Sequence, residues 1–393
     1  MKVVIIGIGA VGSVLAKFLS SDTNVESIVC ADLNLNRAKN FLNFKSNKIK
    51  LVEVDANNMK SLISVANGCD LIINTSLPRF NENIMKVALE VKSNYQDLCS
   101  HLDSDNFPEQ FKFNEQFKKL GLVALINTGM APGITNILAK DTTNLFDEID
   151  VIKIRTLQNQ IAITPIFALS PEIIMEESLE PAIKFENGGF IKVKQFSEFE
   201  DFEFYPGYLR FVYSVYGDEI STLSRNLKAK TINFMAGGTD IESSKAMFDL
   251  GLFSTDPIKV NSVEVIPFEF LSQIPIDIPT PKEMSDLIKS GAFKDSEMRL
   301  AVEVNGKRFG IKIKAKSMLK FHSAKEINMK FEGANYISFP TGLAAYCFSK
   351  VLISMAKKGV FAPESLPDEL ISSVLTNLIS HGVSIERSIS SDY

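Results

Sequence analysis

Three glycines near the amino terminus have the spacing that a phosphate-binding turn requires. Gly7, Gly9 and Gly12 follow the apolar run "VVII", and a helical pattern follows them. In such a turn the first glycine permits the tight bend, the second lets the backbone approach a pyrophosphate, and the third lets helix and strand pack closely. The N–H groups at the helix start, at Ala10 and Val11, would then bind the phosphates.

An acidic residue strengthens this interpretation. Asp32 ends the second apolar run, twenty residues after Gly12, where a carboxylate can bind the hydroxyl groups of an adenosine ribose. The combination predicts a dinucleotide site. A carboxylate there repels a 2′-phosphate, so NAD is favoured over NADP, although Arg37 could soften that preference. The alternative for Asp32 is a cap for the next helix.

The same opening stretch resembles a short secretion signal, because Lys2 precedes an apolar segment. Lys17 interrupts that segment, and the helical pattern continues through Leu15, Phe18 and Leu19. A signal peptide also has no need of an acidic residue one strand later. We therefore expect the segment to stay in the protein as a strand, a turn and a helix.

Further polar residues follow the next apolar runs. Asp55 and Ala56 follow the third run, where an adenine would lie, and "NTS" follows the fourth, near the expected nicotinamide. The residues in that second group are Asn74, Thr75 and Ser76. Ordinary polar turns are the alternative for both groups.

A glycine and proline cluster ends the sixth apolar run. Gly129, Pro132 and Gly133 could form a close turn with a helix that starts near Ile134. A helix start beside the cofactor crevice would suit a substrate carboxylate. The alternative is a hinge between domains.

The elements that would position these residues alternate in type. Short apolar runs at 3–6, 27–31, 49–54, 71–74, 95–98 and 123–127 are separated by helical patterns. Strands that alternate with helices predict a parallel sheet covered on both faces. From about residue 148, polar and apolar residues alternate, which indicates a second α+β domain. The last sixty residues return to helix, with one helix expected to end at Gly359.

Composition limits the classes of function. The chain has 393 residues, enough for two domains, and a net charge of −5 without a long basic run, so nucleic acid is a poor candidate partner. Four scattered cysteines and three histidines lack metal-ligand spacing, so we expect no metal site and a reduced cytoplasm. No apolar run approaches the roughly 18 residues that cross a bilayer.

The order of the motifs resembles the saccharopine dehydrogenase family. "GIGAVG", "AD", "VDA", "YQDL" and "NTGMAPGITNILA" are followed by "SPEIIMEESLEPAIKFENG", "YPGY", "STLSR", "VEVIPFEFL", "TGLAAY" and "GVFAPE". The resemblance implies a doubly wound Rossmann domain over residues 1–138, completed by 335–393. It also implies an inserted α+β domain for substrate binding and dimerisation over 139–334, and a homodimer.

The resemblance further implies NAD(P)-dependent hydride transfer at a carbon that bears nitrogen, on an amino acid such as saccharopine or lysine. Two alternatives stay open, namely a polyamine substrate like carboxynorspermidine and an NAD-sensing protein without catalysis. The arginine that saccharopine reductases carry at the start of the "SPEII" helix is replaced by Pro171 and Glu172. "YGDEI" stands where the polyamine enzymes have "YHEEL".

A carboxylate or an imidazole near the reacting nitrogen could take its proton. Asp97, His101 and Glu172 are the candidates, in that order. Strand-end capping, solvent exposure and helix-dipole stabilisation are the respective alternatives. Tyr208 and Arg225 are candidate substrate contacts, and Lys184 is a weaker one, with plain surface solvation as the alternative for the two cations.

Overall fold

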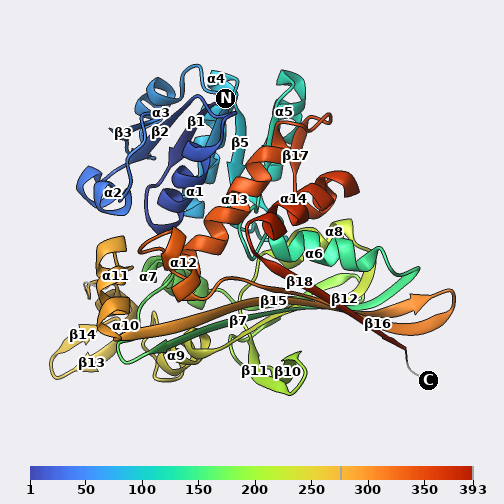
Figure 1. Ribbon diagram of the computed structural model, residues 1–393. Coiled ribbons are helices and arrows are strands. Elements are labelled where there is room, and N and C mark those ends of the chain that lie inside the picture. The colour runs from blue at the N-terminus through green and yellow to red at the C-terminus, as the bar shows by residue number, and fades with distance from the viewer. Residues whose placement is uncertain (275–276, 392–393) are drawn as a thin grey trace.

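The computed structural model describes residues 1–274 and 277–391. Six strands of its amino-terminal part and β17 from the carboxy-terminal segment form a sheet in the order β17-β6-β5-β4-β1-β2-β3, in which every strand pair is parallel (Figure 1). Its strands are β1 Lys2–Ile6, β2 Ser27–Asp32, β3 Ile49–Glu53, β4 Leu71–Asn74, β5 Asn94–Asp97, β6 Val123–Leu125 and β17 Gly359–Phe361. This is the predicted doubly wound α/β fold.

Both faces of the first sheet are covered, as its continuous apolar strands require. In β1, Val3 and Ile5 belong to one hydrophobic cluster, whereas Val4 and Ile6 belong to another on the opposite face. The surrounding helices are α1 Ala10–Ser21, α2 Leu35–Phe41, α3 Met59–Ala66, α4 Asn81–Val91, α5 Asn114–Leu120, α13 Ser338–Leu352 and α14 Asp368–Ser380, with short 3-10 turns at Pro78–Phe80, Glu109–Phe113 and Pro363–Ser365.

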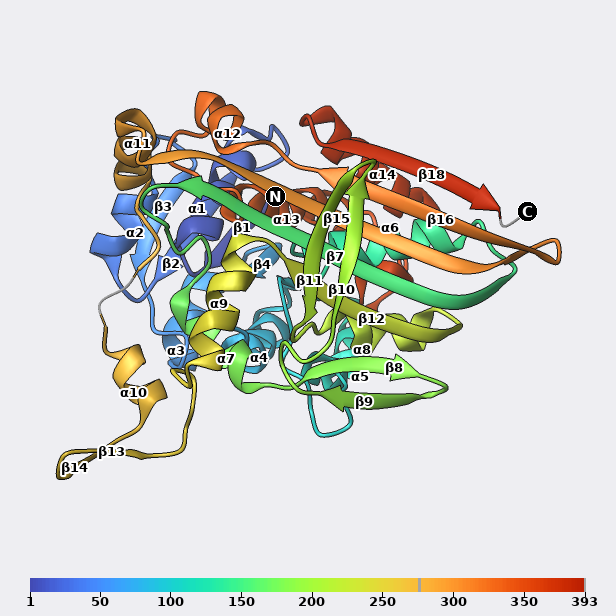
Figure 2. The same cartoon turned by 90° about the horizontal axis from the view of Figure 1, so that it is seen from below.

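The second sheet is mixed and strongly elongated (Figure 2). The long strands β7 and β15 pair antiparallel at its centre, while β12 pairs parallel to β7. Its strands are β7 Glu148–Ala162, β8 Ala182–Glu186, β9 Gly189–Val193, β10 Phe199–Tyr205, β11 Tyr208–Ser214, β12 Ala229–Gly237, β15 Phe293–Arg308, β16 Ile311–Lys320 and β18 Ser384–Ser391.

Several helices and a small hairpin accompany this sheet. They are α6 Ile134–Thr143, α7 Pro171–Leu179, α8 Glu219–Asn226, α9 Thr239–Asp249, α10 Pro267–Ser272, α11 Pro281–Ser290 and α12 Ala324–Lys330, with the hairpin β13 Ile258–Val260 and β14 Val263–Val265. Within the described residues, no helix combines the length and the apolar character needed to cross a bilayer.

The carboxy-terminal segment contributes to both sheets. Helix α13 packs on α1, and β17 pairs with β6, whereas β18 returns to β16 of the second sheet. The helix expected to end at Gly359 is shorter than predicted, since α13 ends at Leu352. Gly359 lies seven residues beyond that helix end and instead begins β17, which pairs with β6.

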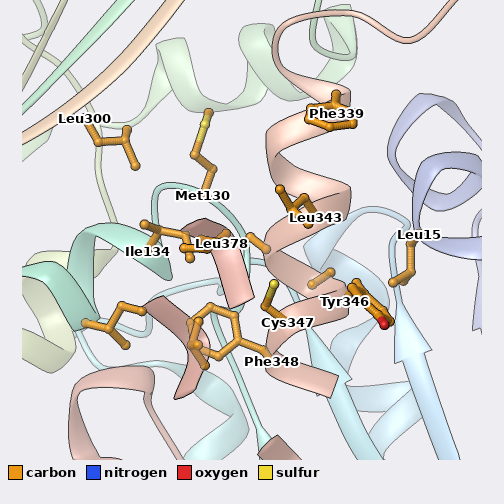
Figure 3. Close-up of a cluster of buried hydrophobic side chains, with 14 of the residues drawn as sticks. Leu15, Met130, Ile134, Leu300, Phe339, Leu343, Tyr346, Cys347, Phe348 and Leu378 are labelled. Atoms are coloured by element: carbon orange, nitrogen blue, oxygen red, sulfur yellow. The ribbon is translucent and has the colours of Figure 1, made fainter. Parts of the chain in front are cut away.

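One hydrophobic core joins the two parts of the molecule. Leu15 of α1, Ile134 of α6, Leu300 of β15 and Phe348 of α13 belong to the same buried cluster (Figure 3). Because α6 and α13 lie between the sheets, the two parts are fixed against each other by apolar contacts.

Candidate functional site

The glycine turn after β1 is built so closely that side chains would not fit at two of its positions. A Cβ on Gly12 would lie 2.1 Å from the carbonyl oxygen of Gly7, and one on Gly7 would lie 2.7 Å from the nitrogen of Ser76. Gly7 also has a φ of +93°. A Cβ on Gly9, in contrast, would meet only the guanidinium of Arg37, at 3.5 Å, because Gly9 faces open space.

That open space is a cavity of about 920 Å³, which we call the first cavity. Gly9, Ala10 and Val11 line it at the start of α1, a helix whose amino terminus has no side-chain cap. Uncapped N–H groups with the positive end of a helix dipole suit a pyrophosphate. Its lining also includes Asp32, Asp55 and Ser76, which the sequence predicts to contact a dinucleotide.

Asp32 lines the first cavity at the end of β2. Its two carboxylate oxygens accept hydrogen bonds from the backbone N–H groups of Ile8 and Asn34, at 2.6 and 2.8 Å. These bonds tie the glycine turn to the end of β2 and fix the carboxylate where a ribose would lie. Arg37, also in this cavity, pairs with Asp277.

The other predicted cofactor residues lie at the same sheet edge. Asp55, Ala56, Thr75 and Ser76 line the first cavity. Asn74 is buried beneath it, and its amide oxygen accepts hydrogen bonds from the backbone and hydroxyl groups of Ser76 at 2.9 and 2.6 Å. Asn74 therefore holds Ser76 in place without lining the cavity.

A second cavity of about 320 Å³ adjoins the first. Val11, Thr75 and Ser76 line both cavities, so the two spaces meet where the predicted nicotinamide would lie. The second cavity is largely apolar. Among its described lining residues there is no Lys, Arg or His, but there are four acidic residues, Glu177, Asp218, Glu219 and Asp240.

Two of these acids are buried next to each other at the start of α8. Asp218 accepts a hydrogen bond from the Ser100 N–H at 2.7 Å, and burial raises its pKa to about 7. Glu219 is only 1% exposed, and one of its carboxyl oxygens has no hydrogen-bond partner in the described structure. Burial and the charge of Asp218 raise the pKa of Glu219 to about 8.

Glu177 approaches this pair from α7. Its side chain is exposed and lines the cavity, and desolvation by the protein around it, together with the charges of Asp218 and Glu176, raises its pKa to about 8. Asp240 differs, because Tyr336 and Gln160 donate hydrogen bonds to its carboxyl at 2.6 and 2.7 Å. Glu177, Asp218 and Glu219, which we call the acidic cluster, are thus the groups available to bind a cation.

The three predicted catalytic residues are not brought together. Asp97 is 1% exposed and lines neither cavity, and its carboxyl accepts hydrogen bonds from the Asn127 N–H and the Gln110 amide. Burial raises its pKa to about 7. His101 is exposed and lines neither cavity. Glu172 lines the first cavity and pairs with Arg79.

Only some of the predicted substrate residues line a cavity. Gly129 and Pro132 line the second cavity, and Gly133 packs against Gly129 behind them. The N–H groups of Gly133, Ile134 and Thr135 already donate to protein oxygens, so the start of α6 has fewer donors for a carboxylate than we expected.

The remaining predicted contacts lie elsewhere. Tyr208 donates to Glu297, Arg225 stacks on Phe107 with its guanidinium carbon 3.9 Å from the ring centroid, and Lys184 pairs with Glu198. None of the three predicted residues lines either cavity.

Sequence reasoning did not select the acidic cluster. Asp218 and Glu219 belong to "YGDEI", which the sequence distinguishes only by its difference from the "YHEEL" of the polyamine enzymes. Glu177 lies in a helix that contains several acids, and nothing in the sequence distinguishes it from Glu176. A useful signal was the pair of adjacent acids beside Ile220 and Leu223, the apolar residues of a short helix, because acids next to a buried helix face are uncommon. Of the described residues, no set of three potential ligands is arranged to hold a metal ion.

Comparisons with known proteins agree with this architecture. The family model described as "Saccharopine dehydrogenase NADP binding domain" matches residues 3–125, and "Saccharopine dehydrogenase C-terminal domain" matches residues 129–383. Saccharopine dehydrogenase (L-Glu forming) from Saccharomyces cerevisiae has the same fold, with a TM-score of 0.71 over 99% of both chains at 16% identity.

Two curated proteins are similar in sequence. Carboxynorspermidine synthase of Vibrio cholerae is 27% identical over 402 residues, which cover 94% of each chain. Carboxyaminopropylagmatine dehydrogenase of Synechocystis sp. is 24% identical over 299 residues, which cover 72% of this chain and 74% of the relative. With the two family models that together cover nearly its whole length, the chain belongs to the saccharopine dehydrogenase family and is an NAD(P)-dependent oxidoreductase of that type.

Proposed function

We propose that this enzyme transfers hydride at a carbon–nitrogen bond of a polyamine-like substrate similar to carboxynorspermidine. The observation that carries this proposal is the lining of the second cavity, with the acidic cluster and no cationic side chain among its described residues. A substrate with several ammonium groups would neutralise these acids, whose isolated charges are costly to bury. The names of the two curated relatives support the same choice.

The same lining argues against saccharopine, which was the first expectation from the sequence. A substrate with several carboxylates needs charge-assisted hydrogen bonds, most effectively from arginine. The acidic cluster would instead repel such a substrate. An amino-acid substrate such as saccharopine therefore suits this cavity less well than a polyamine does.

The residues of both cavities have separable tasks in the proposed reaction. When bound, the nicotinamide ring supplies or accepts the hydride. Thr75 and Ser76 lie where the cavities meet, so they would position the reacting carbon. Glu177 and Asp218, with pKa values of about 8 and 7, can give a proton to the amine nitrogen or take one from it near neutral pH. Asp97 would act as a positioning residue, because it accepts a hydrogen bond from the backbone of Asn127, two residues before Gly129 in the cavity lining.

Three finer points belong to this proposal. Asp32 supports a preference for NAD over NADP. The resemblance to the family supports a homodimer, which light scattering on the purified protein would test. Four free cysteines, of which Cys30 and Cys347 are buried, are consistent with a reducing cytoplasm.

Substrate oxidation tests the proposal. The protein is incubated with NAD+ or NADP+ and with carboxynorspermidine, saccharopine or lysine, while the absorbance of the reduced nicotinamide is followed. We expect turnover with carboxynorspermidine at the highest kcat/KM. Turnover with saccharopine alone would overturn the polyamine proposal, and tight NAD(H) binding without any turnover would favour an NAD-sensing role.

A further inference from the structure

The arginine beside the predicted ribose site is already engaged by the second domain. Arg37, on α2, donates from Nε and Nη2 to the two carboxylate oxygens of Asp277, at 3.2 and 3.1 Å. Asp277 lies shortly before α11 and is 240 positions after Arg37 in the sequence. A bidentate pair of this kind fixes both the position and the plane of the guanidinium.

Arg37 lies where it could contact a 2′-phosphate. It lines the first cavity together with Asp32, and its Nη1 lies 3.5 Å from the point that a Cβ on Gly9 would occupy. An arginine close to the adenosine ribose is the usual means of binding the additional phosphate of NADP. Here the donors of that arginine are directed at a protein carboxylate.

The segment that carries Asp277 is anchored on the glycine turn. Ile278 is 9% exposed and forms a small apolar cluster with Ala10 and Phe41. Two residues later Thr280 caps α11, with its hydroxyl accepting from the N–H of Glu283. The position of Asp277 above α2 is thus fixed by packing on one side and by a helix start on the other.

We propose that Asp277 is a specificity-determining residue for the cofactor. It occupies the guanidinium of Arg37 and adds a second negative charge near Asp32, so that a 2′-phosphate must break an ion pair to bind. NAD, which lacks that phosphate, leaves the pair intact. Both side chains are partly exposed, 36% for Arg37 and 59% for Asp277, so the effect is moderate.

Two adenosine fragments test this proposal without substrate or turnover. Dissociation constants for 5′-AMP and 2′,5′-ADP are measured by calorimetry on the full chain, and their ratio is compared between variants. We expect Asp277→Asn to raise the relative affinity for 2′,5′-ADP about two- to fivefold, the range that an exposed ion pair allows. Arg37→Gln in the same chain should remove that gain.

Asp286→Asn is the matched control. Asp286 is an exposed acid on the nearby helix α11, and its change removes the same charge without touching Arg37. An equal gain in this control, or a gain from Asp277→Asn that persists with Arg37→Gln, would overturn the proposal in favour of a general charge effect. An unchanged ratio in Asp277→Asn would overturn it as well. Because no substrate is present, these results are independent of the proposed polyamine reaction.

Discussion

The carboxyl groups of the acidic cluster line the second cavity, and the proposed reaction depends on them. Asp218 and Glu219 are neighbours in sequence and both buried, and Glu177 faces them from another helix. Placing three acids together without a cation is unfavourable for folding, and their raised pKa values express that cost. Carboxyl groups with strongly raised pKa values in a cleft are typical of functional sites.

At this scale the first prediction concerns proton transfer. Glu177→Gln should lower kcat/KM for the polyamine substrate about 10²-fold or more, because a group that binds and deprotonates the amine is lost. In the wild type, kcat/KM for oxidation should rise with pH between about 7 and 8, as Glu177 and Asp218 lose their protons. The two acids interact, so the profile reports the pair.

Steady-state kinetics from pH 6 to 9 measure both effects. Glu90→Gln, a change of an exposed glutamate on α4, is the control and should leave the profile unchanged. A Glu177→Gln enzyme with the wild-type pH profile would show that another group manages the proton.

Glu219 leads to a prediction about stability. Its pKa is about 8 in the folded protein, against an ordinary value of 4.5. The folded state therefore holds a proton that the unfolded state releases, and this group lowers stability progressively as pH rises from 4.5 to 8. Glu219→Gln should increase the free energy of unfolding at pH 8 by at least about 1 kcal/mol and have little effect at pH 4.5.

Urea unfolding of both proteins at several pH values measures this difference. Equal gains at pH 4.5 and pH 8 would mean that Glu219 does not titrate in this range in the folded protein.

At the scale of elements, the glycines of the turn between β1 and α1 differ in what they affect: Gly9 is expected to matter for cofactor binding and Gly12 also for stability. Gly9 has room for a Cβ in the free protein, but that atom would occupy the space proposed for a pyrophosphate. Gly9→Ala should keep the melting temperature within about 1 °C and weaken NADH binding about tenfold or more. Gly12→Ala should also lose stability, because its Cβ would overlap the carbonyl oxygen of Gly7.

Fluorescence titration with NADH and thermal melts distinguish these outcomes. Gly189→Ala in β9 is the control, since its Cβ would meet nothing closer than 4.0 Å. Wild-type affinity in Gly9→Ala would contradict the placement of the pyrophosphate.

Another prediction concerns the contact between α13 and α1. A Cβ on Gly342 would lie 2.6 Å from a methyl carbon of Val14, so the two helices touch at a glycine. Gly342→Ala should cost about 1–3 kcal/mol of stability through overpacking. Val14→Ala in the same chain should recover part of that loss, because it removes the methyl groups that clash.

A double-mutant cycle with chemical denaturation gives the coupling energy directly. Strictly additive effects of the two changes would contradict a direct contact at this position.

For the molecule as a whole, the sequence predicted the fold better than the second cavity. The βαβ alternation and the glycine spacing predicted the parallel sheet, because both are local patterns in consecutive residues. The structure also places Asp32, Asp55, Thr75 and Ser76 around one cavity, since parallel strands end at the same edge. Their contact with a cofactor stays a prediction.

The acidic cluster could not be predicted in this way. It combines α7 with the start of α8, and the distance between them depends on how β8 and β12 pair in the second sheet. The ion pair between Arg37 and Asp277 likewise joins residues 240 positions apart. The periodicity of a single segment does not predict such long-range contacts. Motif resemblance alone suggested Tyr208 and Arg225, and both residues lie outside the two cavities.

Truncation tests the dependence of the first sheet on the end of the chain. A fragment of residues 1–138 lacks both β17 and α13, so it exposes the β6 edge and the apolar face of α1. We expect this fragment to aggregate and to bind NADH poorly, whereas the full chain remains dispersed. Size-exclusion chromatography compares the two, and a monomeric fragment that binds NADH normally would contradict this view.

The position of β17 at the edge of the first sheet also has a consequence for protein synthesis. Strand β6 leaves the ribosome more than two hundred residues before its partner Gly359–Phe361. During that interval the growing polypeptide carries an open strand edge, which other nascent chains could join. Fast elongation or chaperone binding over this interval would therefore raise the yield of native enzyme without changing its final stability.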